Sequence, residues 1–138
     1  MHQQLGGSPD TVAGNMRTAL AALANVNIRG IAPSFDPPHI RVVVEDDDFD
    51  ATYEAMKGAG LNPTVHSAVT ITLPDKQGAV NSAWDVLDSL GYTVEAILVV
   101  PGGGTGQAIV SFGIVQSPIP NWSDTAAEDL AANVLRNL

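Results

Sequence analysis

The chain of 138 residues contains no cysteine and only six lysines and arginines, against fifteen aspartates and glutamates. Without cysteine it forms no disulfide bond, uses no thiolate in catalysis and holds no zinc or iron–sulfur centre through thiolate ligands. The formal charge of −9 provides no positive field for nucleic acid or anionic lipid, so we expect neither as a partner. The first residues lack the basic segment and apolar stretch of a secretory signal, which together with the missing cysteines predicts a cytoplasmic protein.

Long hydrophobic runs are also missing. The longest, 96–101, is far shorter than the roughly 20 apolar residues of a membrane helix, so we expect no membrane span. Hydrophobic residues nevertheless make up 45% of the chain, which is enough to bury a core. The length fits one ordinary domain or two small ones that share a core.

Hydrophobic periodicity divides the chain into helices and strands. Apolar residues at helical spacing predict helices over about 10–24, 48–59, 78–90 and 123–138. Alternating and branched apolar residues predict strands over 26–32, 40–45, 69–73, 93–100 and 107–115, after a glycine-rich opening strand in 1–6. Proline and glycine predict breaks at 33–38 and 74–78 and a hairpin turn at 102–106. Ser123 is expected to cap the last helix, and Trp122 to pin the preceding linker against the sheet.

The predicted elements repeat in the order β-α-β-β-α. At an offset of 66 residues Leu20 falls on Val86 and Ile28 on Val94. We therefore predict an α+β fold of two ferredoxin-like modules in tandem, residues 1–66 and 67–138, with antiparallel sheets and helices on one face. The second module has no evident fourth strand, and the open edge that results invites pairing with the other module or another chain.

Three segments resemble the ACT domains, small ferredoxin-like modules that bind amino acids and regulate metabolic enzymes. Val69–Ala79 is similar to the opening strand, turn and helix start of that family, and Leu87–Val94 and Ala24–Arg29 to its helix end and second strand. The order of elements across 8–115 resembles stand-alone tandem ACT proteins, which have no catalytic domain. The resemblance implies a non-catalytic regulatory protein that senses a small amino acid between its modules and requires no cofactor. It also implies a homodimer and a partner enzyme or transporter.

The turn at 75–79 is the main candidate for the ligand site. A strand that runs into a helix N-terminus offers free backbone N–H groups and a positive dipole to a carboxylate, and Gly78 lets a ligand approach the backbone. A plain β–α turn without a ligand remains an alternative. The resemblance extends the site to the matching turn of the first module and to the second strands. The predicted ligand-binding residues are Asp75, Lys76, Gln77, Gly78, Ala79, Asp10, Thr11, Asn27 and Thr93.

Other motifs predict no metal site. The acidic run 45–50 begins like a calcium loop, but Ala51 and Lys57 stand where such a loop needs glycine and glutamate, which favours a solvated helix start. His2, His39 and His66 lack the spacing of metal ligands, although His66 lies near the predicted junction between the modules.

Two further functions stay open. One is an assembly module that has lost its ligand sites and retains sheet edges and helix faces for oligomerisation. The other is a small enzyme, which the sequence supports poorly because no nucleophile, base and orienting group occur together at recognisable spacing. We therefore expect no catalytic residues.

Overall fold

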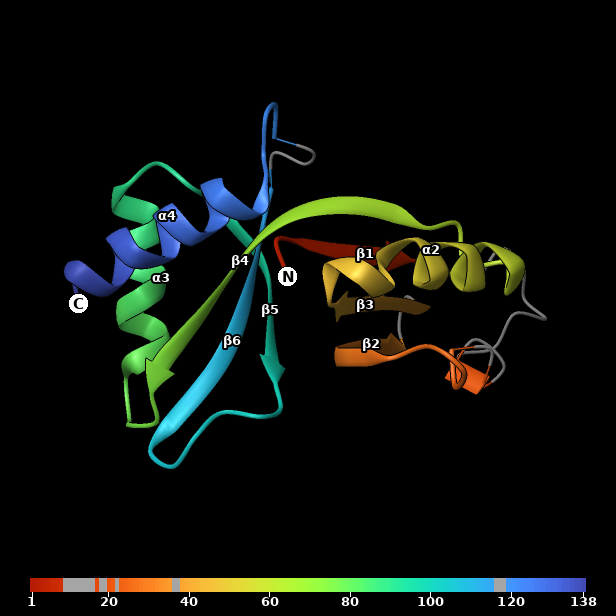
Figure 1. Cartoon of the computed structure of the whole chain (residues 1–138), viewed down its shortest axis with the longest axis horizontal. Helices are drawn as coiled ribbons and strands as arrows, with labels where there is room; N and C mark the ends of the chain where they lie inside the picture. The colour runs from red at the N-terminus through yellow and green to blue at the C-terminus, as the bar shows by residue number, and fades with distance from the viewer. Residues whose placement is uncertain (9–16, 18–19, 22, 36–37, 116–118) are drawn as a thin grey trace.

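The computed structural model describes residues 1–8, 17, 20–21, 23–35, 38–115 and 119–138. The fold is α+β, with a six-stranded antiparallel sheet of order β2-β3-β1-β4-β6-β5 (Figure 1). The strands are β1 Gln3–Gly7, β2 Ile28–Phe35, β3 Pro38–Val44, β4 Thr64–Pro74, β5 Val94–Val100 and β6 Gln107–Ile114. The helices within the described residues are the short 3₁₀ turn η1 Asp46–Asp48, α2 Phe49–Gly58, α3 Ala79–Ser89 and α4 Asp124–Arg136.

Strand β4 connects two parts of the molecule. Its residues 64–67 pair with β1, and its residues 68–74 pair with β6. In Figure 1 the strands β1–β3 and α2, called the first half here, lie to the right, and β5, β6, α3 and α4, the second half, lie to the left. Because β4 changes its antiparallel partner from β1 to β6 along its length, one sheet runs through both halves.

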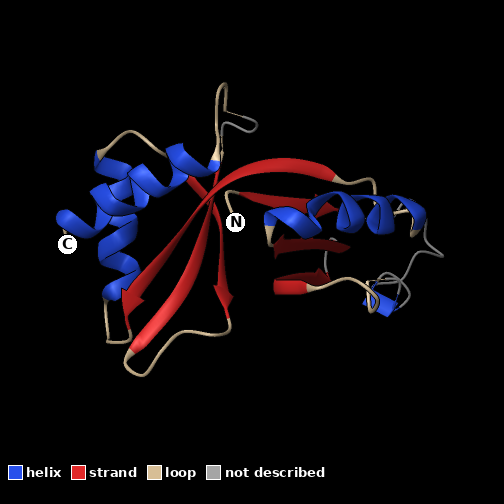
Figure 2. Cartoon of the chain, viewed as in Figure 1, coloured by secondary structure: helices blue, strands red, loops and turns tan. Residues whose placement is uncertain are grey.

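Each half has its own core between sheet and helices (Figure 2). In the first half Met56 of α2 packs with Leu5 and Val42 of the sheet. In the second half α3 and α4 cover β4 and β6, where Val69, Ile71 and Leu73 are almost completely buried and Thr72 between them is exposed. This burial confirms the alternation predicted for β4.

A third cluster joins the halves. Val43 of β3 packs with Leu98 and Val100 of β5. Successive side chains of a strand point to opposite faces, so Val43 lies on the face opposite Val42, away from the helices. Its contact with β5 shows that the sheet curls and brings the helix-free faces of the two halves together. The approach of β2 to β5 is close, since a Cβ at Gly30 would lie 3.1 Å from the carbonyl oxygen of Val99.

The structure confirms most predicted elements and changes one. Strand β2 continues through Pro33 to Phe35 and β3 begins at Pro38, so the break predicted over 33–38 is wrong for these residues. β2 is an edge strand, and an edge strand tolerates proline because one side of its backbone needs no partner. Most of the helix predicted at 10–24 lies outside the described residues. Within that range, the described residues Arg17, Leu20 and Ala21 are helical.

The edge of β4 is open where the sequence predicts a missing strand. Within the described residues no strand pairs with 71–74 on the side away from β6. A groove of about 430 Å³ lies there, between Thr70–Thr72, Met1 and α4. No helix among the described residues is both long and apolar enough to cross a membrane.

Candidate functional site

The turn between β4 and α3 leads directly into the N-terminus of a helix. Gly78 is the N-cap of α3, with a left-handed φ of 85°, and no side chain caps the helix. The N–H of Ala79 donates to the carbonyl of Lys76 at 3.2 Å, whereas the N–H groups that follow it in the first turn have no intrahelical partner and are directed at the space beyond Gly78. The sequence forms this turn because Pro74 ends the strand and glycine adopts a positive φ without strain.

Further backbone hydrogen bonds hold the turn in place. The backbone N–H of Asp75 donates to the carbonyl of Gly106, 2.9 Å away, which ties the turn to the β5–β6 connection. The N–H of Lys76 donates to the carbonyl of Pro74 at the same distance. The side chains of 75–77 are left exposed, while Ala79 is buried against the core. The turn therefore presents a cationic lysine and a helix N-terminus on a fixed backbone.

A cavity of about 330 Å³ adjoins the turn. Its lining residues come from the turn, from the first turn of α3 and from the last residue of the sequence; they are Pro74, Lys76, Gln77, Gly78, Ala79, Ser82 and Leu138. Four of the five residues predicted in this turn thus line one cavity. None of these lining residues, all of which lie in the described part of the chain, belongs to the first half.

The other predicted ligand residues lie elsewhere. Thr93 follows the C-terminal end of α3, and the 11 residues of that helix separate it from the turn by about 16 Å. It lines a smaller cavity of about 150 Å³ with Tyr92 and Ile119. Asn27 is exposed and its amide donates to Asp48, 3.5 Å away, in the first half. Asp10 and Thr11 fall outside the described residues. A single chain therefore does not bring Asn27 or Thr93 to the turn.

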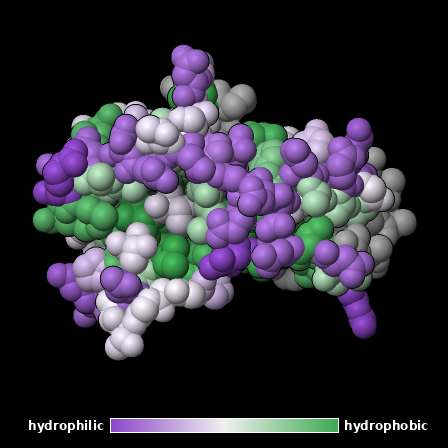
Figure 3. All heavy atoms as spheres, viewed as in Figure 1, coloured by the Kyte–Doolittle hydropathy of each residue, from purple (hydrophilic) through white to green (hydrophobic). Residues whose placement is uncertain are grey.

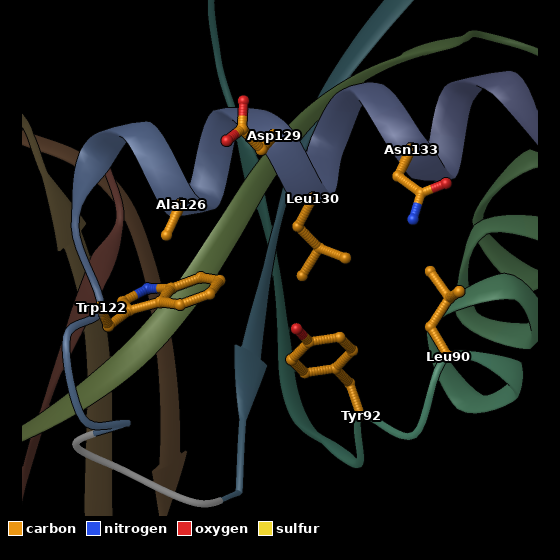
Figure 4. Close-up of a pocket in the computed structure, with 7 residues that line it drawn as sticks. All are labelled: Leu90, Tyr92, Trp122, Ala126, Asp129, Leu130 and Asn133. Carbon is orange, nitrogen blue, oxygen red and sulfur yellow. The ribbon is translucent and has the colours of Figure 1, made fainter.

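A second cavity of about 370 Å³ lies beneath α4. Figure 4 shows the side chain of Leu130 extending from α4 toward the ring of Tyr92, with the ring of Trp122 to its left and the carboxylate of Asp129 directed away from both rings. The indole nitrogen of Trp122 donates to the carbonyl oxygens of His2 and Ala68, at 2.9 and 3.2 Å, which confirms that this tryptophan pins the linker to the sheet. Asp129 is the charged residue among the described lining residues of this cavity, and its carboxylate is directed away from the rings.

The junction between the halves contains a polar network that sequence reasoning missed. Gln4 is fully buried, and its amide donates to the hydroxyl of Ser111, 2.9 Å away. Arg41 donates to Gln4 at 3.3 Å and to Glu95 at 3.1 Å. Glu95 also contacts Nδ1 of His66, 2.8 Å away. The network links β1, β3 and β4 to β5 and β6, and His66 lies at the junction as its position in the sequence suggests.

The surroundings of two histidines at this junction lower their pKa and so favour the neutral form. Burial lowers the pKa of His66 most, and the charge of Arg41 lowers it further, against the opposing effect of Glu95. The pKa of His39 is lowered by burial and by Arg41. His39, Arg41 and Glu95 also line an open cleft of about 320 Å³ between β2, β3 and β5. Protonation of either histidine would place a second cation beside Arg41.

Exposed apolar side chains gather on the second half. Figure 3 shows hydrophobic surface at the left of the view, over α3 and α4. Trp84, Leu90, Leu135 and Leu138 are each between 38% and 50% exposed. On β5, at the far edge of the sheet, Val99 is 69% exposed.

The fold resembles solved structures along almost the whole chain. Protein BT0572 from Bacteroides thetaiotaomicron superposes with a TM-score of 0.67 and 19% identity, over 98% of this chain and 86% of that one. The regulatory subunit of aspartate kinase from Thermus thermophilus, in its ligand-free form, gives 0.64 and 18%, over 99% and 93%. The corresponding subunit from Thermus flavus gives 0.56 and 18%, over 97% and 92%. At these identities the likeness concerns the fold.

No family model and no curated protein matches the sequence.

Proposed function

We propose that this chain is a non-catalytic regulatory protein built from two ACT-like modules, 1–66 and 67–138, that senses a small amino acid. The likeness to regulatory subunits of aspartate kinase over at least 97% of the chain is the observation that carries the proposal. The module boundary is supported by β4, whose pairing changes from β1 to β6 between Ser67 and Ala68. In this interpretation β4 is the last strand of one module and the first strand of the next.

The amino acid binds at the turn 75–79. Its carboxylate accepts from the N-terminal amides of α3, and Lys76 adds a positive charge beside them. A second copy of the chain completes the site, and Asn27 and Thr93 are the candidates for contact with the ammonium group or side chain. The apolar surface on α3 and α4 supports such a homodimer.

Regulation follows from a shift between two arrangements of the copies. A ligand that bridges them favours one arrangement by no more than its differential affinity for the two. A partner enzyme or transporter binds the two arrangements differently and is regulated by the shift between them. The likeness of the fold to regulatory subunits of an enzyme supports this part of the proposal.

A thermal-shift screen with the twenty amino acids tests this proposal. A specific ligand at 100 times its dissociation constant adds about 2.7 kcal/mol to the free energy of unfolding. Lys76→Gln removes the charge at the turn and should weaken binding at least tenfold. Lys57→Gln is the matched control, because Lys57 is the other lysine of the chain and is exposed on α2. Equal binding by the two variants would place the ligand elsewhere.

The second candidate is an assembly module without a ligand. The exposed apolar residues of α3 and α4 and the open edge of β4 favour it. Flat melting curves with all twenty amino acids, together with a stable dimer in sedimentation, would support assembly alone and contradict sensing.

A further inference from the structure

Three metal-ligating side chains that are far apart in the sequence meet at the junction between the halves. They are His2 before β1, Asp46 at the start of η1 and Asp124 at the start of α4. One ligand atom from each residue lies within 4.8 Å of the other two. Figure 1 places the N-terminus at the middle of the molecule, where β4 passes from one half to the other.

The separations already approach those around a metal ion. Nδ1 of His2 lies 3.1 Å from Oδ1 of Asp46 and 2.8 Å from Oδ1 of Asp124. Zinc binds nitrogen and oxygen at about 2.0–2.2 Å, so neighbouring ligand atoms around it lie roughly 3.0–3.6 Å apart. The 3.1 Å separation already lies in this range, and the 2.8 Å contact of His2 with Asp124, which is a hydrogen bond here, would have to widen by a few tenths of an ångström to admit the ion.

The backbone behind each ligand is anchored. The carbonyl of His2 accepts from the indole of Trp122 and from the amide of Ala68, both at 2.9 Å. Asp124 is the first residue of α4, which Ser123 caps by accepting from the amide of Ala126. Asp46 opens η1, where the amide of Asp48 donates to the carbonyl of Glu45 at 2.9 Å. The three side chains therefore start from fixed positions.

The two carboxylates of this cluster favour the binding of a cation. Asp46 and Asp124 bring two carboxylates together on a chain with a formal charge of −9. The ammonium of Met1 lies 3.4 Å from Asp46 and 3.6 Å from Asp124 and supplies part of the opposite charge. A divalent ion bound by both carboxylates and an imidazole neutralises them directly, and it would displace this ammonium.

We propose that His2, Asp46 and Asp124 bind one divalent transition-metal cation of the zinc class. One imidazole nitrogen with two carboxylate oxygens suits zinc or manganese, whereas calcium and magnesium prefer oxygen ligands alone. Because Asp46 belongs to the first half and Asp124 to the second, the ion would also fix the two halves together. The site is separate from the turn at 75–79, so a test of metal binding is independent of a test of amino-acid sensing.

Isothermal titration of the full chain with zinc chloride at pH 7.5 tests the site. We expect one zinc ion per chain, and at least a tenfold loss of affinity in His2→Gln and in Asp124→Asn. His2→Gln keeps the backbone carbonyl that Trp122 and Ala68 hold, so this variant should fold normally. At the same zinc concentration, zinc should also raise the melting temperature of the unmodified chain more than that of Asp124→Asn.

Two matched controls separate this site from general binding to an acidic surface. Asp47→Asn makes the same charge change on an exposed neighbour of Asp46, and His66→Gln removes a histidine outside the cluster. Both should keep their zinc affinity within twofold. The proposal is overturned if zinc does not bind below 1 mM, on the millimolar scale of weak association, or if Asp47→Asn loses as much affinity as Asp124→Asn.

Discussion

Arg41 on β3 and Glu95 on β5 form an ion pair of 3.1 Å between strands of different halves. Their side chains are only 12% and 23% exposed, and the two residues are 54 positions apart in the sequence. The pair lies beside the apolar contact of Val43 with Leu98 and Val100, so polar and apolar contacts together hold the helix-free faces of the two halves against each other. The coupling between the halves therefore depends on this junction.

Removal of the Glu95 carboxylate should destabilise the protein more than removal of a similar surface charge. Glu95→Ala removes the carboxylate partner of the largely buried Arg41, which keeps its longer hydrogen bond to Gln4, and we expect a loss of roughly 1–3 kcal/mol in the free energy of unfolding. Glu45→Ala is the control, because its pair with Arg29 is 2.9 Å long but more exposed, and it should cost less than about 1 kcal/mol. Urea unfolding measures both, and equal losses would contradict a special role for the junction.

Stability should fall as the pH drops below the ordinary pKa of histidine, about 6.5. The folded protein lowers the pKa of His66 and His39, so between the folded and unfolded values the unfolded chain binds more protons. The contribution is fully present above pH 6.5 and is lost on acidification. His66 faces Arg41, Glu95 and His39, and Thr64 contacts its other ring nitrogen at 2.8 Å.

Urea unfolding at pH 7.5 and 5.5 measures this dependence. His66→Gln should lose less stability between the two pH values than the unmodified chain. An NMR titration in which the His66 imidazole protonates above pH 6.5 would contradict the account.

A methyl group at Gly113 should strain the junction. A Cβ there would lie 2.5 Å from Oε1 of Gln4, which Ser111 and Arg41 hold in place. We expect Gly113→Ala to cost about 1–3 kcal/mol, as overpacking does in a tightly filled core. The double variant with Gln4→Ala should lose less than the sum of the two single losses, because the clash disappears. Strictly additive losses in chemical unfolding would show that Gln4 does not restrict this position.

The conformation of the turn gives another prediction. Gly78 has a φ of 85° and open space around its Cβ position, so Gly78→Ala strains only the backbone and should cost roughly 1 kcal/mol. Gly58 also has open space and is helical with an ordinary φ, so Gly58→Ala should stabilise by up to about 1 kcal/mol. Thermal unfolding of both variants measures whether the melting temperature falls in Gly78→Ala and rises in Gly58→Ala. A stabilising Gly78→Ala would contradict the left-handed turn.

Local patterns in the sequence were sufficient to predict β4 and the start of α4. The alternation around Thr72 predicts β4, and Ser123 predicts the start of α4, where its hydroxyl does accept the amide of Ala126. The sequence pattern of the opening strand is a poor strand signal because it is rich in glycine. The structure gives the reason, since a Cβ at Gly7 would lie 2.7 Å from Met56 and one at Gly6 would lie 2.9 Å from His66.

The junction could not be predicted because its contacts depend on how the sheet curls. The pairing of Arg41 with Glu95, and of Gln4 with Ser111, joins residues with no common periodicity. The same holds for His2, Asp46 and Asp124, which have no metal spacing along the chain and meet only when both halves are in place. For Asn27 and Thr93 the sequence predicts a proximity that the fold does not provide. The resemblance to ACT domains groups these two residues with the turn at 75–79, but a single folded chain holds them apart from it.

The most direct test of amino-acid sensing is an NMR titration of the isotope-labelled chain with the ligand that the thermal screen selects. The account predicts that the largest and saturable shifts occur at the backbone amides of 76–79 and at Val80, the first residues around the N-terminus of α3. Shifts centred instead on the indole N–H of Trp122, or no saturable shift with any of the twenty amino acids, would contradict it.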